Sequence, residues 1–260
     1  MSRTLAAVVA HPDDDTFGLA GSVALHADDP DFRFVLIHAT SGEAGMISDP
    51  SLATRETLGR VREEEDRRSW AALGRVPDRH EWLRYPDHAV ADVPFEEIVE
   101  RIAAILAEER PDVVVTFGPD GVTAHPDHIA VGEATAEAFE RLRTDGRGGF
   151  RRLIRIAIPQ TLLESWNELL VAAGREPMDP TQLYHPRGVP DGSIGLIVDT
   201  SSVADRVVAA LEEHRTQAND IQDMSEQERA MMVSREHGVI SWPPWAPGDP
   251  VLHDVFEGLD

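Results

Sequence analysis

Short apolar segments alternate with longer amphipathic segments over the first 150 residues of this chain. Residues 4–10, 32–39 and 112–117 are rich in Val, Ile, Leu and Phe, and each is followed by a polar or Gly/Pro-containing segment. Between them, apolar residues recur three and four positions apart, which is typical of helices that bury one face. Strands that alternate with helices form a parallel, doubly wound sheet. The pattern therefore predicts an α/β fold.

The remaining expected elements follow from the same patterns and from Gly and Pro breaks. Further strands are expected at 82–85, 153–158 and 194–199. Helices are expected at 17–27, 55–73, 94–109, 129–142, 203–219 and 226–236. Segments 143–149 and 176–191 are expected to be loop insertions, and the Pro- and Trp-rich segment 241–260 an irregular tail. We interpret residues 1–260 as a single domain with a decorated C-terminal half.

Two amino acids are missing, and their absence narrows the chemistry. The chain has no cysteine, and all 24 residues of the Lys+Arg class are arginine. Without a thiol there is no cysteine nucleophile, disulfide or Cys-type zinc site. Without a lysine amine there is no Schiff base and no Walker-type phosphate lysine. Catalysis is left to carboxylates, imidazoles, hydroxyls, guanidinium groups and any metal that these hold.

The formal net charge of −23 argues against nucleic acid and against anionic membrane surfaces as partners. We interpret the acidic excess mainly as a solubilising surface, with steering of cationic groups as the alternative. No apolar segment approaches the roughly 18 residues of a membrane-spanning helix. Residues 1–10 lack a signal-type cleavage region, so a cytoplasmic location is expected.

Polar side chains follow four of the expected strands. The first strand is followed by His11 and the acidic residues 13–15, and the second by Ser41-Gly42-Glu43. The third is followed by Pro86-Asp87-His88, and the fourth by the His- and Asp-containing segment 118–128. Ligands of such sheets bind beyond the carboxyl ends of the strands. An active site is therefore predicted at this edge.

Two of these segments together suggest a metal. Two imidazoles and one carboxylate are a common ligand set of catalytic zinc, and His11, Asp14, His125 and His128 offer one residue more than that set needs. Zinc lowers the pKa of a bound water to about 7. A nearby carboxylate can accept the proton of the water, and a further histidine can stabilise an oxyanion. Either segment alone could be a helix cap or a turn, but both together predict metal-assisted hydrolysis.

These two segments also resemble a known family. Ala10–Asp15 (AHPDDD) with His125–His128 (HPDH) is similar to the LmbE-like, or PIG-L, family of zinc-dependent N-deacetylases. The resemblance implies a Rossmann-like, three-layer αβα fold with a mostly parallel sheet. It implies removal of an acetyl group from an N-acetylated amino sugar or a related conjugate. Supporting similarities are Ser41-Gly42-Glu43, the helix at Arg62–Glu65, Pro86-Asp87 and the late segment His214–Gln217.

The resemblance also implies roles for single residues. The zinc ligands would be His11, Asp14 and His128, with one zinc ion per chain and ferrous iron as the alternative metal. Asp13 would be the general base that deprotonates water, and the neighbouring Asp14 charge should favour its holding the proton. His125 would stabilise the tetrahedral intermediate.

Three further residues match positions that contact sugar hydroxyls in the family, namely Glu43, Arg62 and Asp87, with ion pairs between loops as the alternative interpretation. The expected partner is thus a small amino-sugar substrate, and a homo-oligomer is possible. One departure is Thr123, because mycothiol-pathway members carry a tyrosine close to the second histidine motif. This substitution weakens the case for mycothiol-type substrates.

Other interpretations stay open. Asp13, Asp14, Asp15, Asp120 and Asp127 could hold two metal ions in a phosphoester hydrolase. The enzyme could instead be an amidase acting on a sugar-linked thiol conjugate, or the chain could bind sugars without catalysis. Asp15 is expected to cap a helix or orient a ligand histidine. His38 is expected to be a core residue, and His80 and His88 to show no metal-like spacing. Residues 242–245 are expected in an oligomer contact or in the core.

Overall fold

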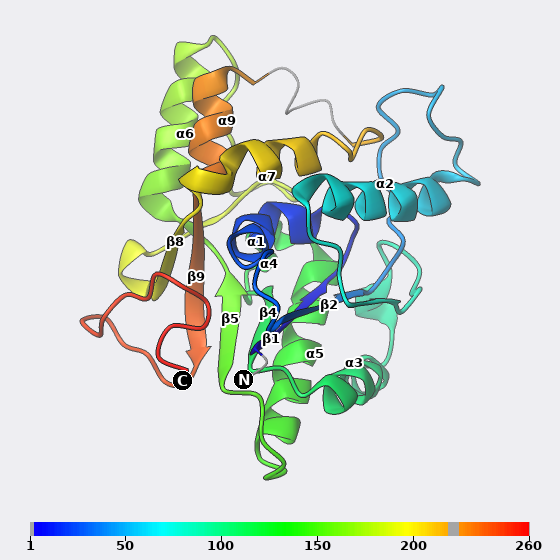
Figure 1. Ribbon diagram of the computed structural model, residues 1–260. Helices are drawn as coiled ribbons and strands as arrows, with labels where there is room; N and C mark the ends of the chain where they lie inside the picture. Colours follow the sequence, from blue (N-terminus) through cyan, green and yellow to red (C-terminus); the bar gives the residue numbers. More distant parts are fainter. Residues whose placement is uncertain (1–2, 218–223, 260) are drawn as a thin grey trace.

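A seven-stranded sheet between two layers of helices organises the computed structural model, which describes residues 3–217 and 224–259 (Figure 1). The strand order is β3-β2-β1-β4-β5-β9-β8, and the first five strands are parallel. The predicted α/β, three-layer, mostly parallel fold is confirmed. The parallel strands are β1 (Arg3–Val9), β2 (Phe32–His38), β3 (Arg79–Trp82), β4 (Val113–Phe117) and β5 (Arg152–Ile156).

Two antiparallel strands extend the sheet, β8 (Leu196–Asp199) and β9 (Arg235–Trp242). The expected helix 226–236 is wrong at its end, because α9 (Glu226–Val233) stops early and β9 begins at Arg235. The tail expected from residue 241 is wrong at its start, since Trp242 belongs to β9. Pairing with strands on both sides satisfies the backbone groups of β9 and overrides its local pattern.

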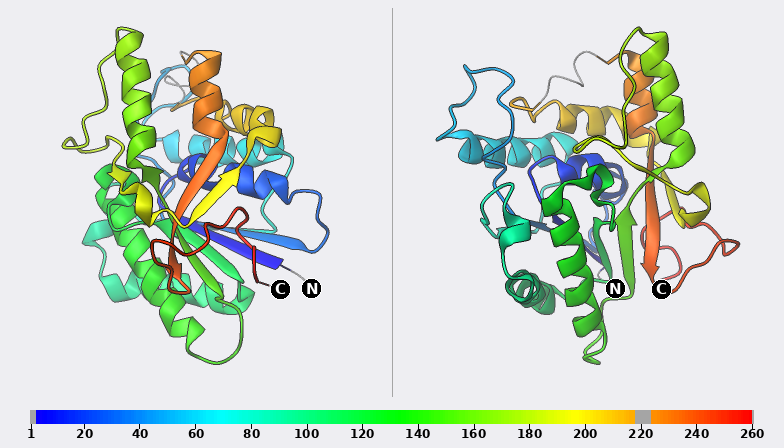
Figure 2. Two further views of the ribbon diagram at one scale, coloured as in Figure 1. Left: turned by 90° about the vertical axis from the view of Figure 1, so that its left-hand side faces the viewer. Right: turned by 180° about the vertical axis from the view of Figure 1, so that it is seen from behind.

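The helices form two layers. α1 (Asp14–Leu25), α2 (Leu58–Leu73) and α7 (Ala204–Leu211) pack together on one face, and α3 (Phe95–Glu109) packs with α5 (Pro126–Arg143) on the other (Figure 2). The expected helix 203–219 ends at Leu211, and residues 218 and 219 lie outside the described part. Within residues 3–217 and 224–259, no helix is long and apolar enough to cross a membrane.

The second half of the chain adds structure that the sequence did not predict. α6 (Gln160–Ala172) stands beside α9 at the end of the molecule away from the termini (Figures 1 and 2). A separate two-stranded sheet joins β6 (Ile158–Pro159) to β7 (Gly188–Val189), so the expected insertion 176–191 is tied to the chain just after β5. These pieces cover the carboxyl end of β5.

The strand order explains where the site lies. The chain leaves β1 to form β2 on one side and returns later to form β4 on the other side, so the order reverses between β1 and β4. Both strands are buried, apart from the first residue of β1, because helices cover the two faces of the sheet. A crevice forms at such a reversal, beyond the carboxyl ends of the strands. His11 follows β1 there, and α4 (Gly121–Ala124) and α5 follow β4.

The fit of α5 against β4 yields a test. A Cβ atom at Gly132 of α5 would lie 2.7 Å from the carbonyl oxygen of Phe117, which is backbone and cannot rotate away. We expect Gly132→Val to lower the free energy of unfolding in urea by about 1–3 kcal/mol. The control is Gly192→Val, where a Cβ meets nothing within 4 Å, and which should change stability by less than about 0.5 kcal/mol. Equal effects of the two substitutions would contradict the close packing.

Candidate active site

A strained turn connects β1 to α1 and separates three consecutive carboxylates. Asp13 has a φ of 118°, a conformation that residues other than glycine rarely adopt. The carboxylate of Asp13 reaches Arg62, and that of Asp14 reaches His11. Asp15 turns inward, where it accepts a hydrogen bond of 2.6 Å from the indole N–H of Trp70. The carboxylates of three consecutive residues therefore lie in three different environments.

The three expected metal ligands come together, and all are largely buried. The Nδ1 atom of His11 lies 3.2 Å from one carboxylate oxygen of Asp14, and the Nε2 atom of His128 lies 3.2 Å from the other. The two imidazole nitrogens are 3.1 Å apart. Tetrahedral zinc with bonds of 2.0–2.2 Å separates its ligand atoms by about 3.3–3.6 Å. The donor set therefore fits a zinc ion.

The outer nitrogen of each ligand histidine has a partner of its own. The Nδ1 atom of His128 lies 2.9 Å from the carbonyl oxygen of Gly121, which fixes Nε2 toward the site. The Nε2 atom of His11 lies 3.0 Å from Asp87 and 3.4 Å from Asp127. Burial alone would lower the pKa of His11, but hydrogen bonds to the surrounding carboxylates outweigh it and raise this pKa well above its usual value. The pocket thus favours positive charge, which a divalent ion also supplies.

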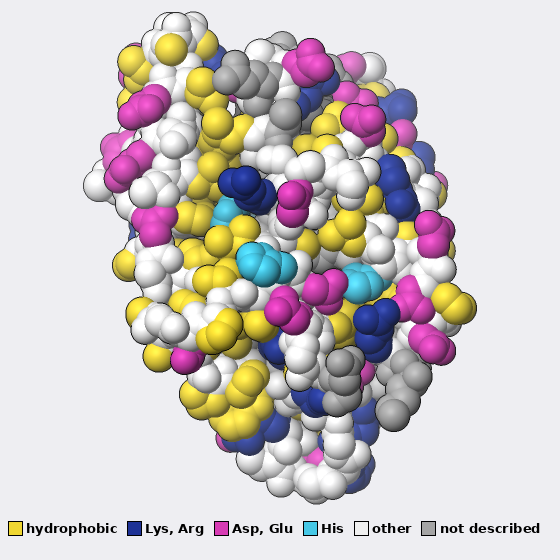
Figure 3. Space-filling view, turned by 60° about the vertical axis from the view of Figure 1, so that its left-hand side comes forward, with side chains coloured by type: hydrophobic (Ala, Val, Ile, Leu, Met, Phe, Trp, Pro, Cys, Tyr) yellow, Lys and Arg dark blue, Asp and Glu magenta, His cyan; other side chains and the backbone are white. Residues whose placement is uncertain are grey.

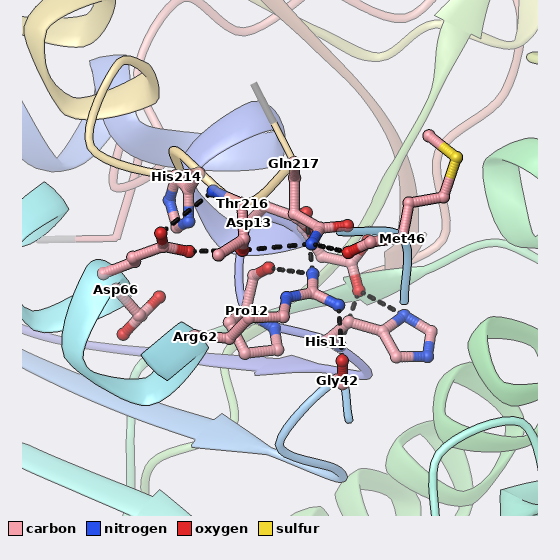
Figure 4. Close-up of polar contacts among 12 residues, drawn as sticks. His11, Pro12, Asp13, Gly42, Met46, Arg62, Asp66, His214, Thr216 and Gln217 are labelled. Atoms are coloured by element: carbon pink, nitrogen blue, oxygen red, sulfur yellow. Dashed lines mark hydrogen bonds and ion pairs between the residues drawn. The ribbon is translucent and has the colours of Figure 1, made fainter. Parts of the chain in front are cut away.

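Arg62 holds Asp13 in place (Figure 4). Its guanidinium group lies 2.8 Å from the carboxylate of Asp13 and donates hydrogen bonds to the carbonyl oxygens of Pro12 and Gly42. A Cβ atom at Gly42, where φ is +64°, would lie 2.3 Å from this group, so the close approach needs glycine. Burial raises the pKa of Asp13 to about 7, although the Arg62 charge opposes this rise. The carboxyl of Asp13 can therefore exchange a proton near neutral pH.

His125 presents one nitrogen to the site. Its Nδ1 atom accepts a hydrogen bond from the backbone N–H of Asp127 at 3.1 Å, so the neutral ring carries its proton on Nε2. Burial lowers the pKa of His125 to about 4, which keeps the ring neutral. Its ligand atom also lies within 4.8 Å of those of His11 and His128. The ring can donate a hydrogen bond to an oxygen that gains negative charge beside the three ligands.

The expected substrate residues Glu43 and Asp87 join two loops. Glu43 accepts a hydrogen bond of 2.9 Å from the backbone N–H of Asp87, and Asp87 accepts one of 2.8 Å from the backbone N–H of Ala44. The other oxygen of Asp87 faces His11. Glu43 also lines an open polar groove of about 380 Å³ together with Arg60. Asp87 therefore lies behind His11, whereas Glu43 reaches an open surface.

Two supporting motifs of the sequence meet beside Arg62. Glu65 of α2 accepts hydrogen bonds from the backbone N–H and the hydroxyl of Thr216, at 2.9 and 2.6 Å. The Nε2 atom of His214 lies 3.0 Å from the hydroxyl of Thr16 in α1. The late segment His214–Gln217 is thus hydrogen-bonded to α2, which carries Arg62, and to α1, which follows Asp13.

The sequence did not single out Tyr184, which lies next to His125 together with His88. The backbone N–H of Tyr184 donates to the carbonyl oxygen of Thr123 at 3.0 Å, and its ring centre lies 5.0 Å from that of His125. The phenol oxygen is 3.4 Å from Nδ1 of His88. A phenol therefore stands near the histidine although Thr123 cannot supply one. Tyr184 lies far from His125 in the sequence, within an expected insertion, so no spacing pattern connects the two.

An apolar chamber of about 350 Å³ opens beside Asp14 and His128. Figure 3 shows a hollowed face on which histidine and acidic side chains lie next to hydrophobic ones. The polar groove at Glu43 and this chamber share no lining residue. Asp14 and His128 therefore border the apolar chamber, whereas none of the three proposed ligands lines the groove. Apolar residues of the chamber include Phe17, Phe117, Ile156, Trp166, Met178 and Met232.

Four of the five aspartates considered for a two-metal site point to different partners. Asp13, Asp14 and Asp15 diverge as described, and Asp127 accepts hydrogen bonds from the backbone N–H groups of His88 and Val90 at 2.8 and 3.0 Å. In the described part of the chain, no cluster of three or more possible metal ligands unites two of the five aspartates. The geometry favours the histidine-based site over a carboxylate-bridged pair of ions.

Comparisons with known proteins agree with this geometry. The model of the family described as PIG-L, GlcNAc-PI de-N-acetylase, matches residues 6–139. A 1D-myo-inositol 2-acetamido-2-deoxy-alpha-D-glucopyranoside deacetylase of Kineococcus radiotolerans is 30% identical, over 93% of this chain and 75% of its own. The Thermobifida fusca protein of the same name is 32% identical, over 83% of each chain. The structure of N,N'-diacetylchitobiose deacetylase from Pyrococcus horikoshii has the same fold, with a TM-score of 0.62 and 21% identity over 92% of this chain and 84% of that chain.

The buried ion pair of Arg62 gives a stability prediction. Arg62→Met keeps the aliphatic stem but leaves the Asp13 carboxylate and two carbonyl oxygens without this partner. We expect the free energy of unfolding at pH 7.5 to fall by about 3–5 kcal/mol, as when one member of a buried pair is removed. The control is Arg60→Met on the exposed side of the same helix, which should change it by less than about 0.5 kcal/mol. An unchanged urea midpoint for Arg62→Met would contradict this role.

Proposed function

The chain belongs to the PIG-L family of GlcNAc-PI de-N-acetylases, and on this premise we propose that it is a metal-dependent hydrolase that removes the acetyl group from an N-acetylated amino sugar or a related conjugate. The observation that carries the proposal is the convergence of His11, Asp14 and His128 beside Asp13. The names of its relatives, which are sugar-conjugate deacetylases, support the same reaction.

His11, Asp14 and His128 would hold one divalent ion. Zinc suits this mixed set, and ferrous iron is the alternative because imidazole and carboxylate accept both. When bound, the ion acts as a Lewis acid toward the amide carbonyl and lowers the pKa of water. Asp87 and Asp127 keep His11 oriented, since their carboxylates face its outer nitrogen. All further steps fall to side chains of the chain itself.

Asp13 carries the proton during the reaction, and His125 stabilises the negative charge that develops on the substrate. Asp13 takes a proton from water while the water oxygen bonds to the amide carbon, and Arg62 keeps the carboxylate aimed. The carbonyl oxygen becomes an oxyanion, which accepts a hydrogen bond from Nε2–H of His125. The C–N bond then breaks, and the amine nitrogen takes the proton that Asp13 held. Acetate and an ammonium group are the products, and both protons of the water end on the nitrogen.

The apolar chamber and Glu43 suggest how the substrate lies. The sugar would lie toward Glu43, whose carboxylate can accept hydrogen bonds from hydroxyl groups. The acyl group would face the apolar chamber beside Asp14 and His128. Tyr184 and His88 stand between solvent and His125 and would contact the leaving amino sugar. The same arrangement serves an amidase of sugar-linked conjugates, which a substrate panel separates from a deacetylase. A two-metal phosphoesterase would need ions about 3.5–4 Å apart, and the diverging aspartates do not support it.

Asp13→Asn tests the general base. The amide keeps the shape of the side chain but cannot accept the proton of water, so kcat for acetate release from N-acetylglucosamine conjugates should fall by about 10²–10⁴-fold. Metal content, measured by elemental mass spectrometry, should stay at the wild-type level because Asp13 is not a proposed ligand. The control is Asp28→Asn on the surface, with unchanged kcat. Near wild-type turnover by Asp13→Asn with its metal in place would refute the mechanism.

The apolar chamber predicts a dependence on acyl length. Each additional methylene that enters it contributes up to about 0.8 kcal/mol, which corresponds to about fourfold in kcat/KM. We expect kcat/KM to rise from N-acetyl to N-propionyl to N-butyryl glucosamine conjugates. Trp166→Ala, at the chamber wall, should reduce this gain while leaving the N-acetyl rate nearly unchanged. A steep fall in kcat/KM beyond acetyl would show that the acyl group does not enter the chamber.

A further inference from the structure

A second cluster of imidazoles and carboxylates is buried near the edge of the sheet, separate from the candidate active site. His38 ends β2, His80 lies on the neighbouring edge strand β3, and Asp66 projects from α2. Ligand atoms of these three side chains lie within 4.8 Å of one another. His38 is a core residue, as the sequence predicted. His80 shows no metal-like spacing in the sequence, and the pairing of β3 with β2 brings it close to the other two side chains.

Asp66 is the unexplained member of this cluster. Its exposure is 0%, and neither carboxylate oxygen has a hydrogen-bond partner among the described residues. The nearest polar atoms in the cluster are imidazole nitrogens, at 3.5 Å for His80 and 3.7 Å for His38. Buried polar groups in proteins are almost always hydrogen-bonded, and leaving a carboxylate unpartnered is costly. Something not made of protein atoms can satisfy both oxygens.

The ligand atoms of the cluster lie close enough together to surround one metal ion. The Nδ1 atom of His38 lies 3.0 Å from Nε2 of His80, and that atom lies 3.5 Å from an oxygen of Asp66. Tetrahedral zinc separates its ligand atoms by about 3.3–3.6 Å.

Asp15 completes the arrangement from behind. One of its oxygens lies 3.4 Å from Nε2 of His38, and the other accepts the hydrogen bond of Trp70. A carboxylate on the outer nitrogen of a ligand histidine orients the ring, and Asp87 occupies the same position relative to His11.

We propose that His38, Asp66 and His80 form a second binding site for a divalent transition-metal ion such as zinc, distinct from the site at His11, Asp14 and His128. This site goes beyond the proposed function and does not depend on it. The ion would fasten α2 to the edge of the sheet and thereby support Arg62, which lies one helical turn before Asp66. The His80 side chain is 15% exposed on the edge strand, which gives the ion a path in.

Metal stoichiometry tests the second site. The protein is stripped with a chelator, reloaded with zinc alone, desalted and analysed by elemental mass spectrometry. We expect two zinc ions per wild-type chain, and one in each of His80→Gln, Asp66→Leu and His11→Ala. His253→Gln, which alters an exposed histidine outside both clusters, should keep two. Zinc should raise the Tm of His11→Ala, because that variant keeps the second site.

Two results would overturn the proposal. One is a single zinc ion in the wild type that disappears in His11→Ala. The other is full loading of two ions in both His80→Gln and Asp66→Leu. Asp66→Leu is informative even if His80→Gln folds poorly, because leucine removes the unpartnered carboxylate from an otherwise buried position and should not destabilise the metal-free protein. Deacetylation is measured separately, so loss of activity in Asp13→Asn and loss of the second ion in Asp66→Leu report on different proposals.

Discussion

The backbone turn at Asp13, with a φ of 118°, decides how the whole site is built. A regular helix start would send Asp13, Asp14 and Asp15 along one spiral into a shared environment, where their charges would repel one another. The turn instead divides them among Arg62, the His11–His128 pair and Trp70. Strain of this kind persists only where surrounding contacts overdetermine it, and Arg62 supplies three of those contacts.

Arginine at position 62 makes contacts at this turn that a lysine could not make. Arg62 bonds one carboxylate and two carbonyl oxygens at once, from a planar group with several fixed donors. A lysine ammonium is a compact point charge on a flexible stem and cannot hold these three groups in one plane. It would also lose its proton more readily when buried. The permanently charged guanidinium group of Arg62 keeps Asp13 in one position while the carboxyl of Asp13 gains and loses its proton.

Features that depend on local sequence were predictable, and those that depend on pairing across the fold were not. The strands that precede His11 and Glu43 have apolar patterns of their own, and a parallel sheet necessarily brings their carboxyl ends to one edge. Nothing local indicates that Arg235 starts a strand, because β9 exists through its pairing with β5 and β8. Tyr184 reaches His125 only because its loop bonds to Thr123. Such contacts join segments whose separation in the sequence carries no signal.

α2 shows why a charged sequence can belong to a buried element. Its sequence, LGRVREEEDRRSWAAL, reads as a solvated amphipathic helix. Yet Arg62, Asp66 and Trp70, spaced four residues apart, share one face that is buried against the start of α1 and the end of β2. Burying these groups is favourable only when each charge is met by an opposite charge or a donor. Arg62 and Trp70 meet that condition through Asp13 and Asp15, and Asp66 alone is left for a cation. The helix therefore joins the catalytic turn to the sheet edge through polar contacts in place of an apolar stripe.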